Sequence, residues 1–164
     1  MINGAQVHLL TNHIPILGIP FVLALLLYGL WRKSADLQRF GMIGLVATGL
    51  LAIPAFLSGE EAEEIVEDRA QISETLIENH EEAAEVAFWF LEGIAAAALA
   101  GLVLFRSPKQ LPRWFTQGVV VSLIASGVLM ARVGHLGGLI SHPEIRTDQA
   151  DSVAPGRVLD HDDD

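Results

Sequence analysis

Residues 14–31 read IPILGIPFVLALLLYGLW, a stretch without any charged side chain. Three similar stretches follow at 40–58, 86–105 and 114–131, and the only charged residue in them is Glu92. A helix needs about 20 apolar residues to cross the roughly 30 Å hydrocarbon core of a bilayer. The sequence therefore predicts an all-α bundle of four transmembrane helices. These spans cover about 14–31, 40–58, 84–105 and 114–133.

The composition supports this interpretation and excludes several classes of protein. Of the 164 residues, 51% are hydrophobic and 18% are charged, whereas soluble domains carry about 25% charged residues. The formal net charge is −10, which disfavours binding to nucleic acid. The chain has no cysteine, so disulfides, thiolate metal sites and covalent c-type haem attachment are excluded. We expect one membrane domain over 1–146, followed by a mobile acidic tail over 147–164.

Basic residues indicate how the bundle is oriented. Six of the ten Lys and Arg residues follow the first and third spans, on one side of the membrane: Arg32, Lys33, Arg39, Arg106, Lys109 and Arg113. Short loops rich in Lys and Arg stay in the cytoplasm. We therefore expect both termini and the loop 59–85 to face outward. Without a recognisable targeting peptide, the simplest location is the plasma membrane of a bacterium, with the outward side in the periplasm.

The outward loop carries its own helical pattern. A Ser-x-x-Glu capping box begins at Ser58, and apolar residues then repeat at helical spacing between 65 and 76. We therefore expect an additional amphipathic helix, from Glu60 to about Glu78, against the outer face of the membrane. A second capping pattern at Asn79 predicts that a new helix starts at His80 and continues into the third span.

Five of the six histidines fall near span ends that share the outward side. These are His8, His13, His80, His135 and His142, whereas His161 lies in the tail. Imidazole is the commonest metal ligand in proteins, and carboxylates often complete such sites. We therefore expect a metal or haem site at the periplasmic end of the bundle. The candidate metal ligands are His8, His13, Glu60, His80, Glu81, His135 and His142.

Three of these histidines are the leading candidates for binding a cofactor. His13 lies at the membrane edge with few charges around it. His80 lies beside Glu81, and a nearby carboxylate could hold its second ring nitrogen. His135 lies in the stretch GHLGG at 134–138, whose small residues allow a flat cofactor to approach closely.

Glu92 lies about 12 Å inside the third span, because it follows the first apolar residue, Ala84, by eight positions. Glu81, Glu85 and Glu92 fall on one face of that helix. A carboxyl group inside hydrocarbon usually faces the bundle interior and has a partner. Glu92 could form an ion pair with Arg132, or stay neutral and hydrogen-bonded. Alternatively, Glu85, Glu92 and Arg132 could form a proton path or support the metal site from below.

Four short motifs carry a resemblance to a known family. They are HLLTNHIP at 8–15, SGE at 58–60, NHE at 79–81 and GHLGG at 134–138. Together they resemble a large family of uncharacterised four-span bacterial membrane proteins, known only as a domain of unknown function. The resemblance covers about residues 5–145 and implies a redox setting, because some members are fused to Rieske or cytochrome c domains. It also implies ligand roles for His13, His80 and His135, with His8 and Glu60 behind them.

These features leave three hypotheses about function open. The first is a b-type haem protein that passes electrons from quinol to a periplasmic redox protein, with two imidazoles as axial ligands. The second is a non-haem site for iron, copper, zinc or manganese, held by imidazole and carboxylate groups. The third is a metal-free accessory subunit of an oligomer or larger membrane complex. The chain has no His-Glu-x-x-His or similar catalytic motif, so we assign no enzyme reaction.

Overall fold

The computed structural model describes residues 3–67, 74–106 and 111–142. Every regular element within these ranges is an α-helix. The four long helices are α2 (His13–Trp31), α3 (Ala35–Leu57), α5 (Glu74–Leu104) and α6 (Arg113–Ser141), and the two short helices are α1 (Gly4–Thr11) and α4 (Gly59–Glu67). Each predicted span coincides with a helical stretch long and apolar enough to cross a membrane. The predicted all-α bundle of four long apolar helices is therefore confirmed, and their length and composition suit a multi-pass membrane protein.

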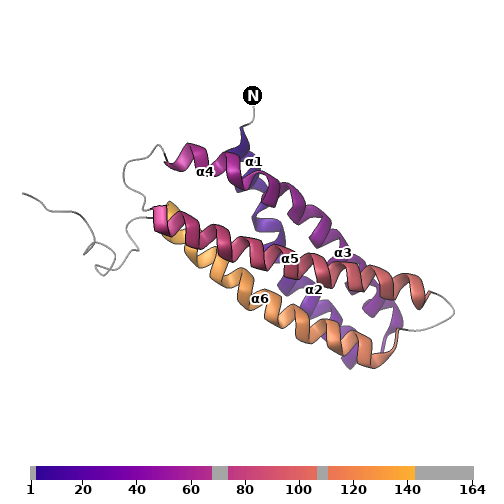
Figure 1. The fold of residues 1–164 in the computed structure, drawn as a ribbon. Helices are drawn as coiled ribbons and strands as arrows, with labels where there is room; N and C mark the ends of the chain where they lie inside the picture. The colour runs from indigo at the N-terminus through magenta and orange to yellow at the C-terminus, as the bar shows by residue number, and fades with distance from the viewer. Residues whose placement is uncertain (1–2, 68–73, 107–110, 143–164) are drawn as a thin grey trace, which may run out of the picture.

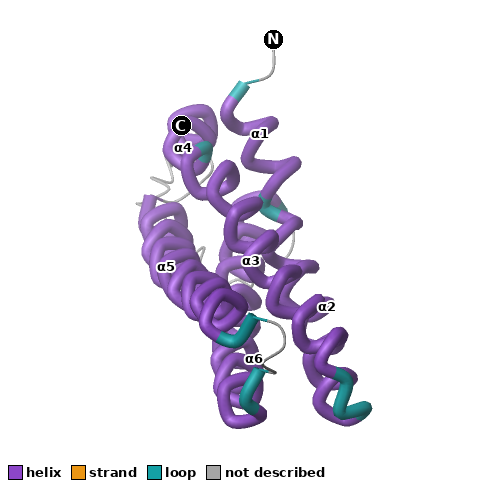
Figure 2. Tube along the Cα trace, turned by 90° about the vertical axis from the view of Figure 1, so that its right-hand side faces the viewer, coloured by secondary structure: helices purple, strands orange, loops and turns teal. Residues whose placement is uncertain are grey.

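The four long helices pack side by side in a closed ring (Figure 1). α2 packs against α3 and α6, and α5 packs against the same two helices. The turn that joins α2 to α3 lies at the end of the bundle where α5 ends and α6 begins, whereas α1 and α4 cover the other end (Figure 2). Polar segments that are far apart in the sequence are thereby brought together at the end that carries α1.

The bundle has a narrow apolar core and an apolar outer surface. The largest fully buried apolar side chains are Ile19, Leu26, Met42, Leu45, Leu91 and Leu123. Every long helix also exposes large apolar side chains, with Phe21 69% exposed on α2 and Val121 67% exposed on α6. An apolar surface that extends around a whole bundle is unfavourable in water and favourable in lipid. The packing therefore agrees with a membrane protein.

Small residues set the distance between neighbouring helices. A side chain at Gly41 of α3 would collide with the buried Leu26 of α2, and one at Gly101 of α5 would collide with Phe115 of α6. Close approach of this kind allows van der Waals contact between helices, which drives their association in a membrane. The glycines are therefore part of the packing and do not mark breaks in the helices.

The predicted amphipathic helix over Glu60 to about Glu78 is not confirmed. α4 covers its first part, residues 68–73 lie outside the described ranges, and α5 is already present at Glu74. The prediction that a helix starts at His80 is wrong, because α5 runs through this residue without a break. Asn79 does not cap the helix, since its Nδ2 donates a hydrogen bond to the Thr75 carbonyl at 2.6 Å, one turn earlier in α5.

The helix α1 was not predicted, although the sequence contains its start signal. The side chain of Asn3 accepts a hydrogen bond from the backbone of Gln6, and the Gln6 side chain accepts one from the backbone of Asn3, which forms a capping box. The chain leaves α1 at Asn12, three residues before Pro15, which has no N–H for the Thr11 carbonyl. The predicted mobile tail, 147–164, lies outside the described residues.

We predict that Gly41→Val destabilises the bundle, because the new side chain meets Leu26 in a core with no space to yield. Overpacking of this kind lowers the free energy of unfolding by about 1–3 kcal/mol. Thermal unfolding in detergent measures the effect. Gly118→Val is the matched control, since a Cβ at Gly118 meets no atom within 4 Å. Equal losses in the two variants would contradict the packing of α2 on α3.

We also predict that the α1 end of the bundle faces the periplasm. Since the chain has no cysteine, a single cysteine reports its own position. We expect a membrane-impermeant maleimide to label Gln6→Cys in intact cells and to label Asp36→Cys only after the inner membrane is opened. Both residues are exposed, one on α1 and the other in the first turn of α3. The reverse labelling pattern would contradict the orientation inferred from the basic loops.

Candidate functional site

The α1 end of the bundle, defined by His8, Ala55, His80 and Val133, contains the candidate site. α1 contributes His8, the end of α3 contributes Ala55, α5 contributes His80 and α6 contributes Val133. These four helices and α4 meet at this end of the bundle (Figure 1). Residues from widely separated parts of the sequence are therefore neighbours here.

His8 attaches α1 to the end of α3. Its Nδ1 lies 2.8 Å from the carbonyl oxygen of Ala55. The last four carbonyls of a helix lack partners within the helix, and Ala55 provides one of them because α3 ends at Leu57. The imidazole therefore supplies a donor to this carbonyl, which also accepts from the Ser58 hydroxyl at 3.3 Å, and in turn its ring orientation is fixed.

His80 is held against α6 in a similar way. Its Nδ1 lies 3.2 Å from the carbonyl oxygen of Val133. Gly137, one turn later, permits this approach: a Cβ at that position would lie 3.1 Å from Cε1 of His80, tighter than most real contacts. The ring of His80 therefore lies directly on the backbone of α6, and a side chain at Gly137 would push it away.

These contacts determine where each ring carries its proton. A carbonyl oxygen can only accept a hydrogen bond, so Nδ1 of His8 and Nδ1 of His80 are both donors. In the neutral imidazole the other nitrogen, Nε2, then has a free lone pair. Burial lowers the pKa of His80 below its ordinary value, and the charge of His8 lowers it further. Metal-binding histidines commonly show this arrangement, in which Nδ1–H donates to a backbone carbonyl and Nε2 binds the metal.

The other histidines at this end are exposed. His13 begins α2, and its Nδ1 lies 3.1 Å from the Leu9 carbonyl of its own segment. His135 lies on α6 between Val133 and Gly137, about 200° around the helix from the side that meets His80. His142 follows the last turn of α6 and is exposed, and His161 lies outside the described ranges. The structure thus holds His8 and His80 on backbone carbonyls at the α1 end and leaves His13 and His135 exposed.

The carboxylates form a contact between α4 and α5. Glu63 on α4 and Glu81 on α5 share a side-chain hydrogen bond. This bond, together with burial and the negative charge of Glu81, raises the pKa of Glu63 from its ordinary value of 4.5 to about 7. Glu60 is exposed on α4. Of the predicted acidic ligands, Glu81 is therefore engaged with a second carboxyl group.

The three residues that were predicted to support the site from below do not form one group. Glu85 and Arg132 are exposed, whereas Glu92 is partly buried in the bundle. Oε1 of Glu92 is buried and has no hydrogen-bond partner. The structure therefore offers no support for an ion pair between Glu92 and Arg132, and Glu92 is separate from the candidate site at the α1 end.

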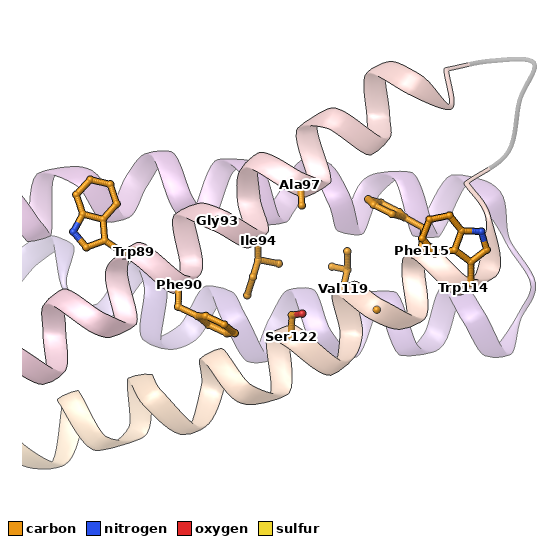
Figure 3. A pocket seen from close by; sticks show the side chains of 10 residues that line it. Trp89, Phe90, Gly93, Ile94, Ala97, Trp114, Phe115, Val119 and Ser122 are labelled. Atoms are coloured by element: carbon orange, nitrogen blue, oxygen red, sulfur yellow. The ribbon is translucent and has the colours of Figure 1, made fainter.

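Within the described part of the chain, no group of three or more His, Cys, Asp or Glu side chains could hold a metal ion. A hollow on the side of the bundle, between α5 and α6, is no alternative (Figure 3). Aromatic and aliphatic side chains with one serine line it, among them Trp89, Phe90, Ile94, Phe115, Val119 and Ser122. None of its lining residues carries a charge or ligates a metal readily, so the two imidazoles of the α1 end remain the candidate site.

Sequence reasoning missed three residues that shape this end. Gly137 is the surface on which His80 lies, and Glu63 is the partner of Glu81. Asn12 has a buried Oδ1 without a hydrogen-bond partner. The capping box at Asn3 could have revealed α1 and its fold-back. The Glu63–Glu81 contact had no signal in the sequence, because the two residues lie on different helices.

Comparisons with protein-family models, with curated proteins and with solved structures find no match for this chain. The family resemblance of the four motifs therefore stays an expectation from the sequence.

We predict that the contact between α4 and α5 weakens as pH rises. A carboxyl whose pKa is higher in the folded protein stabilises the fold fully below about 4.5, and this contribution is lost as pH rises through about 7. Hydrogen exchange of the α4 amides, corrected for intrinsic rates, should show falling protection over this interval. Glu63→Gln should remove most of the dependence, because an amide donates to Glu81 at every pH.

Glu60→Gln is the matched control for this experiment, since Glu60 is exposed on the same helix. It should leave the pH dependence unchanged. A wild-type protein whose α4 protection stays constant from pH 4.5 to 8 would contradict the shared proton.

Proposed function

We propose that this protein is a membrane electron carrier that binds a b-type haem between His8 and His80 at the periplasmic end of its helical bundle. One observation carries the proposal: two imidazoles from different helices each donate Nδ1–H to a backbone carbonyl and keep Nε2 available. Such a pair suits the two axial positions of a haem iron.

The number of protein ligands favours haem over a bare metal ion. A haem iron receives four nitrogens from the porphyrin and needs only two from the protein, whereas structural and catalytic metal sites commonly take at least three protein ligands. The described residues bring together two imidazoles and no group of three candidate ligands. The two-histidine arrangement is therefore more useful to a porphyrin than to zinc, copper or non-haem iron.

The surroundings of the two rings fit a flat cofactor in two respects. A glycine lies beside each ring. A Cβ built on Gly59 would lie 4.0 Å from Cε1 of His8, and one built on Gly137 would lie 3.1 Å from Cε1 of His80. The unpartnered Oδ1 of Asn12 is a buried acceptor that a ligand or water could satisfy. His8 and His80 would hold the group, and the glycines would leave space beside it.

A bound haem supplies one-electron chemistry. The protein contributes the orientation of both imidazoles through Ala55 and Val133. A site at the rim of the bundle is open to the aqueous phase and close to the membrane. This location suits transfer between a carrier dissolved in the bilayer, such as quinol, and a periplasmic redox protein.

The absorption spectrum of the purified protein tests this function. We expect a Soret band and, after reduction, the sharp bands of a six-coordinate low-spin haem. His8→Ala and His80→Ala should each abolish the low-spin spectrum, because each removes one axial ligand. His13→Ala and His135→Ala are matched controls with exposed imidazoles and should retain it.

Two outcomes would overturn the proposal. Stoichiometric metal without a Soret band would indicate the non-haem site. Protein that takes up neither haem nor metal, when expressed with sufficient supplies of both, would indicate the metal-free accessory subunit.

A further inference from the structure

Two buried polar atoms in the middle of the bundle have no partner. One is Oε1 of Glu92 on α5, and the other is Oγ of Ser126 on α6, a residue with no exposed surface. A buried polar group without a hydrogen bond costs free energy, and a buried charge without a partner costs far more. Unpaired groups of this kind are explained by an unseen water, an ion or a functional role.

Helix pairing places both atoms in one layer of the bundle. A Cβ at Gly49 of α3 would lie 3.2 Å from Oε1 of Glu92, so the carboxyl group lies against the backbone of α3. The adjacent Thr48 is buried, and its side chain faces Gly18 of α2. The next residue of α2, Ile19, faces α6. Its side chain would lie 3.7 Å from a Cβ at Gly127, the residue that follows Ser126.

The pairing of α5 with α6 leads to the same layer. The two helices run antiparallel. Gly101 of α5 lies against Phe115 of α6, and His80 of α5 lies against Gly137 of α6. The numbers of two residues that face each other therefore add up to 216 or 217. By this relation Ser126 is level with residues 90 and 91, within about 3 Å along the axis of Glu92. The layer therefore contains Thr48, Glu92 and Ser126 from three different helices.

No opposite charge can neutralise Glu92 in this layer. The membrane-spanning stretches 14–31, 40–58 and 114–131 of the neighbouring helices contain no Asp, Glu, His, Lys or Arg. On α5 itself the nearest charged residue is Glu85, about 10 Å along the helix. Arg132 of α6 and Arg39 of α3 lie toward opposite ends of the bundle, and Arg39 hydrogen-bonds the Phe105 carbonyl.

We propose that Glu92 is a proton-binding site inside the membrane, whose carboxyl group shares a bound water with Ser126. A water needs two to four polar partners in a buried position. Oε1 of Glu92 and Oγ of Ser126 provide two such partners. The Thr48 hydroxyl is engaged elsewhere, because it faces Gly18 of α2 and donates its proton to the Gly44 carbonyl at 2.8 Å.

The ligand is a proton in preference to a metal cation. Hard cations such as Mg²⁺ and Ca²⁺ take six or more oxygen ligands, and this layer offers one carboxyl group and two hydroxyls. A proton requires only the carboxylate itself. Gly49 leaves room for the group, because a Cβ there would lie 2.8 Å from the Cβ of Ala95 and 3.2 Å from Oε1 of Glu92. The inference stands apart from the haem proposal, since it uses none of the residues at the α1 end.

Infrared spectroscopy of the full chain in lipid vesicles tests the proposal. The experiment uses the Glu63→Gln background, which removes the protonated carboxyl group shared with Glu81. We expect a carbonyl stretch from a protonated carboxyl group that shifts in D₂O, disappears at high pH and is lost when Glu92→Gln is added. Glutamine has the shape of the neutral acid, so the variant should fold normally. Glu85→Gln is the matched control on the same helix and should retain the band. Ser126→Ala should retain it at a shifted frequency, because the hydrogen bond to the water is lost.

Carbodiimide labelling provides an independent measurement. Dicyclohexylcarbodiimide reacts with protonated carboxyl groups in apolar surroundings, and mass spectrometry of the peptide that contains Glu92 locates the adduct. We expect labelling to fall at least tenfold between low and high pH and to be unaffected by Na⁺ at constant pH. Protection by Na⁺ would indicate a cation site and overturn the proposal. Absence of the infrared band at every pH at which the helices remain folded would also overturn it.

Discussion

The hydrogen-bonding requirement of the backbone in lipid governs this molecule. No water is present in the bilayer core to satisfy an N–H or C=O group, so each span must be a helix that bonds to itself. Only the helix ends keep unpaired carbonyls. At the α1 end, the carbonyl of Ala55 accepts from His8, 47 residues earlier in the sequence, and from the hydroxyl of Ser58. The same requirement that makes the spans helical therefore also recruits an imidazole to the end of the bundle.

The short helix α1 carries His8 and places its imidazole on the end of α3, at the candidate site. It starts at a capping box on Asn3 and ends at Asn12, before Pro15 of α2. It packs on α3 and α4 and places His8 on the end of α3, while His80 of α5 lies against Gly137 of α6. Glu63 and Glu81 fasten α4 to the same end through a shared proton. Three contacts between helices thus lie at this end of the bundle, and the Nε2 atoms of the two imidazoles take no part in them.

The interior of the bundle contains few polar groups, and most of them have a hydrogen-bond partner. The buried polar residues of the described ranges are Thr48, Ser58, Thr116 and Ser126. Three of them have a hydrogen-bond partner. Thr48 and Ser58 donate to carbonyls of α3, and Thr116 donates to the Gln38 side chain. Ser126 is the exception, and the carboxyl group of Glu92 lies at its level. Elsewhere, lipid surrounds apolar side chains, and a few glycines let the helices approach.

The sequence alone determined the four spans, because a charge-free stretch of about 20 residues has few alternatives to a transmembrane helix. It also placed the histidines at span ends and Glu92 within a span. It did not determine α1, the continuity of α5 through Asn79, or which imidazoles face each other. His13 and His135 were favoured over His8, yet both are exposed. Which way a residue faces depends on how its helix is rotated about its axis, and only packing against Ala55, Val133 and Gly137 decides that rotation.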